Sequence, residues 1–207
     1  SVDYVTFEAS LQHRNPQRGN VNRVYVQVHN RGFAAASNVT VKVLYAPASA
    51  GLPALPADFW TAFPNDPTAA SPWQPVGAAK TIASHSPATP GILEWEWTTP
   101  TTAPQHSCLL VVVDCATDPI PPGTKVLDVD ALVVNEKRAG LKNLHVLDAA
   151  PGTAAWCAID LYGGSPPMPA FRLVAGVGAS HAGILLPRSL APRLTGLVEK
   201  TPTQAQV

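Results

Sequence analysis

Some side chains in this sequence have the types and spacing that chemistry requires. His106 and Cys108 stand two residues apart, so a strand would place both on one face. A cysteine beside a histidine could be a nucleophilic pair or part of a zinc site. No Cys-x-x-Cys or His-x-x-x-His spacing accompanies them, and the six histidines are scattered along the chain. We therefore expect Cys108 to be a core residue or a disulfide partner.

A group of acidic residues follows this run. It consists of Asp114, Asp118, Asp128 and Asp130. Acidic loops at the end of a β-sandwich can bind Ca²⁺ through carboxylate and carbonyl oxygens. The chain has no Asp-x-Asp-x-Asp-Gly loop, and the prolines between Asp118 and Asp128 indicate ordinary turns. We expect no bound metal and no other cofactor, and we keep these aspartates as the calcium candidates.

The segment Gly178-Ala-Ser-His-Ala-Gly183 is the part of the chain most similar to a catalytic motif. A nucleophile elbow has the pattern Gly-x-Ser-x-Gly and is followed by a helix. Here the second glycine comes one position late, and Pro187 follows where a helix should begin. We expect no catalytic residue in this chain and interpret it as a protein that is not an enzyme.

Large aromatic side chains gather in a proline-rich insertion at residues 46–79. Proline removes backbone donors and fixes φ, so this segment is not a central strand. Residues 56–63 could form a short helix, with Pro56 near its first turn. The aromatic residues either cover one end of a core or line a binding surface. We favour the first, because a long loop needs buried side chains to be ordered. They are Phe59, Trp60, Phe63 and Trp73.

Alternating valines predict the strands that would position these side chains. Apolar residues at every second position are typical of a strand with one buried face. Two such runs follow each other: Val24, Val26 and Val28, then Val39, Val41 and Val43. We interpret them as an antiparallel pair joined across residues 32–38.

Further short apolar runs continue the β pattern. They cover residues 80–83, 92–98, 106–114, 130–134 and 141–147. The run at 106–114 is almost continuously apolar, as expected of a central strand buried on both faces. Short strands separated by turns, without a long amphipathic helix, predict an all-β fold. We expect an immunoglobulin-like antiparallel β-sandwich over residues 1–148, with a first edge strand within residues 1–14.

Residues 149–207 predict a small β extension and a polar tail. After a linker at 149–153, apolar runs at 155–162, 170–174 and 182–186 indicate three more strands. These are too few for a second sandwich. We expect them to dock on the first sandwich or to pair with a neighbouring chain, which would make the C-terminal strands a surface for self-association.

The composition of the chain argues against nucleic acid as a partner and against membrane insertion. Lys and Arg together number 14, as do Asp and Glu, so the formal net charge is zero. A neutral chain without a basic cluster argues against nucleic acid. No apolar run is long enough to span a bilayer, so we expect no membrane insertion. No signal peptide is visible and the chain begins with Ser, which suggests a processed chain or a piece of a longer one.

The three cysteines are Cys108, Cys115 and Cys157. An odd count allows at most one internal disulfide. Cys108 and Cys115 are too close along one run to bridge without a sharp reversal. If a disulfide forms, we expect it to join Cys157 to Cys108 or to Cys115.

Several stretches resemble one family of bacterial domains. The run at 22–32, which ends Asn30-Arg-Gly32, followed by Asn38-Val-Thr-Val-Lys-Val43, is similar to the CARDB-like group of immunoglobulin-like domains. Leu93-Glu-Trp-Glu-Trp97 and the run at 106–110 add to this resemblance, which covers about residues 20–148. The chain departs from the family at Glu136, where a second Asn is common. The resemblance implies a secreted or surface β-sandwich attached to a larger protein, often a peptidase or an adhesin, and it carries over no catalytic residue.

Low charge, many prolines and this resemblance favour a non-catalytic extracellular module for binding, adhesion or assembly. We expect it to be secreted or on the cell surface of a bacterium, with a protein or glycan partner that the sequence does not identify. The alternative is an accessory domain of a secreted hydrolase, such as a peptidase, whose catalytic part lies outside this chain.

Overall fold

The computed structural model describes residues 13–48 and 51–148. In this part of the chain, seven strands, two short α-helices and one 3₁₀-helix form. In chain order they are β1 (Val21–Val28), β2 (Ala36–Pro47), α2 (Phe59–Ala62), β3 (Gln74–Pro75), β4 (Lys80–His85), β5 (Gly91–Thr98), β6 (His106–Asp114), the 3₁₀-helix η1 (Pro122–Thr124), α3 (Val129–Asn135) and β7 (Ala139–His145). Every pairing between these strands is antiparallel.

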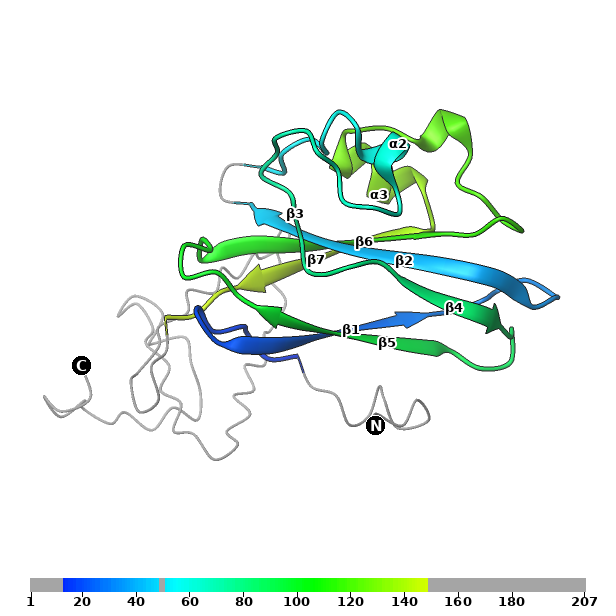
Figure 1. Ribbon diagram of the computed structural model, residues 1–207, viewed down its shortest axis with the longest axis horizontal. Coiled ribbons are helices and arrows are strands. Elements are labelled where there is room, and N and C mark those ends of the chain that lie inside the picture. The colour runs from blue at the N-terminus through cyan, green and yellow to red at the C-terminus, as the bar shows by residue number, and fades with distance from the viewer. Residues whose placement is uncertain (1–12, 49–50, 149–207) are drawn as a thin grey trace, which may run out of the picture. The chain divides into compact units, whose positions relative to one another are not determined.

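The strands form two sheets, which lie as two layers in Figure 1. β1 and β5 pair to make a two-stranded sheet. β2 and β6 form the centre of a five-stranded sheet, in which β7 pairs with the other edge of β6. β4 and β3 pair with successive parts of the free edge of β2. The predicted all-β fold of packed antiparallel sheets is therefore confirmed.

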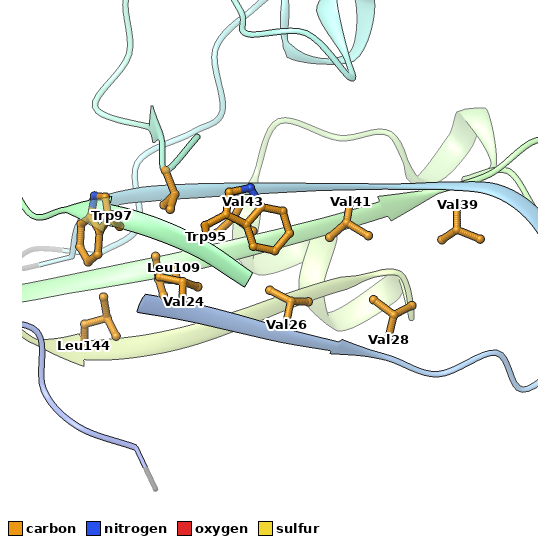
Figure 2. Close-up of a cluster of buried hydrophobic side chains, with 11 residues drawn as sticks. Val24, Val26, Val28, Val39, Val41, Val43, Trp95, Trp97, Leu109 and Leu144 are labelled. Carbon is orange, nitrogen blue, oxygen red and sulfur yellow. The ribbon is translucent and has the colours of Figure 1, made fainter. Parts of the chain in front are cut away.

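The first hydrophobic core lies between the two sheets. Figure 2 shows the valines of β1 lying opposite the valines of β2. Trp95 and Trp97 of β5 and Leu109 of β6 pack into the same cluster. The predicted phase of β1 is confirmed, because its three alternating valines are buried whereas Arg23 is exposed.

The predicted pairing of β1 with β2 is wrong, because the two strands lie in different sheets. β1 pairs with β5, with Val26 opposite Leu93, and β2 pairs with β6, with Val43 opposite Val111. The chain crosses between the sheets through residues 29–35. Two valine rows that face each other across a core are both removed from water, which a hairpin would not achieve by itself.

A second core covers the outer face of the five-stranded sheet. Figure 1 places α2 and α3 on the side of this sheet that points away from β1 and β5. Leu44 of β2 and Leu110 of β6 point into this layer, where they pack with Phe59, Trp73 and Leu132. The insertion therefore explains why β6 is apolar at almost every position, as a strand buried on both faces should be.

The apolar run at 130–134 is helical, not part of a strand. Asp128 caps the N-terminus of α3, where its Oδ1 accepts a hydrogen bond from Ala131 N at 2.8 Å. Val129 and Leu132 are the buried residues of α3, and their spacing of three places them on one face of a helix. The short helix predicted at 56–63 is confirmed as α2.

Four expectations fall wholly or largely outside the described residues. They concern the edge strand within residues 1–14, the β extension at 149–207, the rejected catalytic motif at 178–183, and Cys157. Among the helices of the described part, none has the length and apolar character of a membrane span.

Candidate functional site

The four aromatic residues of the insertion belong mainly to the second core. Phe59 and Trp73 are buried, whereas Trp60 and Phe63 are half-buried. Trp73 Nε1 donates a hydrogen bond to Pro53 O at 2.7 Å, and Trp60 packs edge-on against Phe59. These contacts order the insertion and leave little of its aromatic surface for a ligand.

The four aspartates named as calcium candidates are engaged separately. Asp114 Oδ1 accepts hydrogen bonds from the backbone of Cys115 and of Ile120, each at 2.9 Å, which shapes the turn after β6. Asp118 pairs with Arg138, whereas Asp128 caps α3 and Asp130 lies in its first turn. Within the described ranges, no three His, Cys, Asp or Glu side chains come together as a metal ion would require. Each of these carboxylates therefore has a local structural position.

A buried ion pair between Glu136 and Arg138 connects the loop after β6 to the end of α3. Arg138 Nη1 donates to Asp118 O at 2.8 Å and to Pro119 O at 2.7 Å, and its Nε donates to Glu136 Oε1 at 2.6 Å. Thr124 Oγ1 donates to the second carboxylate oxygen of Glu136 at 3.1 Å. The sequence analysis did not identify this pair, although an acid and an arginine two positions apart could have suggested it.

Hydrogen bonds keep Glu136 ionised despite its burial. Burial by itself would raise the pKa of Glu136, but hydrogen bonds from Arg138 and Thr124 outweigh it and hold that pKa below its usual value. The hydrogen bond with Glu136 likewise raises the pKa of Arg138. The pair is therefore charged at neutral pH and serves to hold the loop, not to transfer protons.

The thiol of Cys108 bonds to an asparagine and not to a histidine. Cys108 Sγ donates to Asn143 Oδ1 at 3.1 Å. Burial raises the pKa of the Cys108 thiol, and the charge of Asp130 raises it further, so the thiol stays protonated. Cys108 and Cys115 are free thiols, and the expected disulfide to Cys157 lies outside the described residues.

Two histidines face each other across the β6–β7 ladder. His106 lies opposite His145, and their ring centroids are 5.5 Å apart in an edge-to-face arrangement. The side chain of Gln105 lies 2.8 Å from Nε2 of His145. The pair occupies the same face of β6 as Cys108, two residues nearer the start of the strand. The sequence interpretation considered His106 but could not know that His145 is its partner.

The crossover between the two sheets presents an exposed aromatic residue. Phe33 is fully exposed in the loop at 29–35. Asn30 holds this loop: its Nδ2 donates to Ala34 O at 2.9 Å and to His85 O at 2.8 Å, and its Oδ1 accepts from Gly32 N at 2.9 Å. His85 is buried and bonds to Val28 O at 3.0 Å. The sequence analysis ended this run at Gly32 and did not consider Phe33.

No protein-family model and no curated protein sequence matches this chain. A comparison of structures matches the crystal structure of the CARDB domain of the PF1109 protein from Pyrococcus furiosus, described as a complex with di-metal ions. The two are 16% identical, the match covers 64% of this chain and 86% of that domain, and the TM-score is 0.35. The likeness is a distant one in fold.

Proposed function

We propose that this chain is a non-catalytic binding or assembly module of a larger secreted or surface protein of a bacterium. The partner we propose is a protein with an apolar pocket that receives Phe33. The full exposure of Phe33 on a loop fixed by Asn30 is the observation that carries this proposal.

A fully exposed phenylalanine has no role in the stability of the described fold. Burying one aromatic side chain at an interface removes about 150–250 Å² from water, which makes it an effective anchor. A loop whose backbone is already held in place loses little conformational entropy when a partner binds. The hydrogen bonds of Asn30 to the loop and to the end of β4 supply that order before binding.

The candidate nucleophiles on β6 form hydrogen bonds that stabilise the fold. A nucleophile would bond to the histidine that serves as its base, whereas the thiol and the hydroxyl at the start of β6 bond elsewhere. Cys108 bonds to Asn143, and Ser107 Oγ donates to Pro104 O at 2.9 Å. These contacts support a binding module over an enzyme.

Site-specific crosslinking tests this function. A photo-reactive phenylalanine analogue placed at position 33 should give a discrete adduct with one protein in the native host. The same analogue at Val134, which is also exposed but lies on α3, is the matched control and should give none. Equal labelling from both positions, or no adduct from position 33, would contradict the proposal. An adduct with a secreted hydrolase would identify the module as the accessory domain of such an enzyme.

A further inference from the structure

The histidine pair on β6 and β7 has the backbone geometry of a cross-strand chelate. Ala48 N donates to His106 O, so the carbonyl of His106 points towards β2 and away from β7. The adjacent residue pair in the direction of β7 is hydrogen-bonded, because Val146 N donates to Gln105 O. His106 and His145 therefore form a non-hydrogen-bonded pair, the kind in which opposite Cα atoms lie about 4.5 Å apart and side chains are closest.

The ring of His145 contacts Gln105 and lies within reach of solvent. The side-chain nitrogen of Gln105 lies 2.8 Å from His145 Nε2, and a metal ion bound at this nitrogen would take the place of Gln105. A neutral imidazole with a free lone pair is the form that binds a metal ion. His106 is exposed and His145 is half-buried, so solvent and ions reach the pair.

We propose that His106 and His145 chelate one divalent transition-metal ion, of the class Zn²⁺, Ni²⁺ or Cu²⁺, which bridges β6 and β7. Imidazole nitrogen suits these ions, whereas Ca²⁺ and Mg²⁺ prefer oxygen ligands. The two ring centroids are 5.5 Å apart, so an ion bound between the rings would contact a nitrogen of each. Water completes the coordination shell, because no third His, Cys, Asp or Glu of the described residues joins them in a metal-binding group.

Cys108 is not a ligand in this proposal. It lies one rung further along the same face, it is buried, and its thiol donates to Asn143. The proposed site thus consists of two histidines on the adjacent strands β6 and β7. It includes neither Phe33 nor the aspartates considered for calcium.

Calorimetric titration of the full chain with Zn²⁺ near pH 7.5 tests the proposal. His106→Asn and His145→Asn should each weaken Zn²⁺ binding by more than about tenfold, since each removes one of two ligands. Mutation of residues that only orient a ligand already lowers metal affinity by about 10–100-fold. His29→Asn is the matched control, because His29 is also exposed but lies beyond β1. It should retain the affinity of the natural chain, and Cys108→Ser should too.

One further measurement separates a metal site formed by the folded ladder from binding to a single exposed histidine. Zn²⁺ should raise the melting temperature of the natural chain and not that of His145→Asn, because the ion binds the folded ladder. Absence of Zn²⁺ binding, an equal effect of His29→Asn, or loss of binding in Cys108→Ser would each overturn the two-histidine assignment.

Discussion

Arg138 binds both carboxylate oxygens of Glu136, with Nε 2.6 Å from Oε1 and Nη2 3.1 Å from Oε2. The Glu136 side chain is almost completely buried, at 2% exposure, and that of Arg138 is 14% exposed. The remaining Nη1 donors of Arg138 bond to the loop after β6. This pair therefore fixes the end of α3 to the turn that carries Asp118.

Removal of Arg138 should destabilise the fold strongly. Arg138→Met leaves the buried Glu136 carboxylate without its counter-charge, and loss of one partner of a buried ion pair costs about 3–5 kcal/mol. Urea unfolding of the natural chain and the variant measures this difference. Lys137→Met is the control, because Lys137 is exposed and its pair with Asp118 lies at the surface. We expect it to change the unfolding free energy by less than about 0.5 kcal/mol. Equal effects of the two substitutions would show that the buried pair has no special role.

Acid should weaken the fold through Glu136. The folded-state pKa of Glu136 lies below its unfolded-state value, so the stabilisation is fully present above the unfolded pKa of about 4.3 and is lost as the pH falls through the folded pKa. Unfolding free energy measured between pH 7 and pH 3 should therefore fall more steeply in the natural chain than in Glu136→Gln, which does not titrate. Parallel curves for the two proteins would contradict this account.

The phase of β1 predicts opposite outcomes at neighbouring positions. Val26→Asp places an unpaired charge between the two sheets and should abolish folding. Gln27→Asp, on the other face of the same strand, should be tolerated. Circular dichroism during heating compares the two variants. If both melted at the same temperature, the assignment of the buried face would be wrong.

Lys42 presents a buried charge that depends on one surface residue. Its side chain is 1% exposed and pairs with Asp66, whose side chain is 55% exposed. Asp66→Asn should destabilise the fold by about 3 kcal/mol, because it leaves the Lys42 ammonium buried without a counter-charge. Adding Lys42→Met should restore most of that loss, since methionine fills a similar volume without charge. Chemical unfolding of the single and double variants measures the recovery, and an additive double variant would refute the coupling.

Truncation of Trp73 should lower the unfolding free energy, whereas truncation of Phe33 should not. Trp73→Ala removes a buried side chain of the second core and its bond to Pro53, and should cost about 3–5 kcal/mol. Phe33→Ala should leave the unfolding free energy unchanged, because Phe33 packs against nothing in the described structure. Thermal unfolding distinguishes them. A destabilised Phe33→Ala would remove the basis for treating Phe33 as an interface residue.

The local residue pattern predicted which segments are strands and which faces they bury, but it did not predict which strands pair with each other. The alternating valines of β1 predicted its buried face, and the continuous apolar run of β6 predicted burial on both faces. Both properties follow from the two-residue period of a strand, which short segments express by themselves. The prediction for the run at 130–134 was wrong, because a short apolar segment suits a strand or a helix. The N-cap supplied by Asp128 favours the helix.

The sequence by itself determined the all-β class, the positions of most strands and the core role of the insertion. The tertiary structure alone decided that β1 pairs with β5, that Glu136 lies against Arg138 inside a loop, and that His145 faces His106. Strand pairing joins segments far apart in the chain and is chosen by the burial of whole faces, which no local periodicity encodes. The histidine pair and the exposure of Phe33 became visible only once those pairings were known.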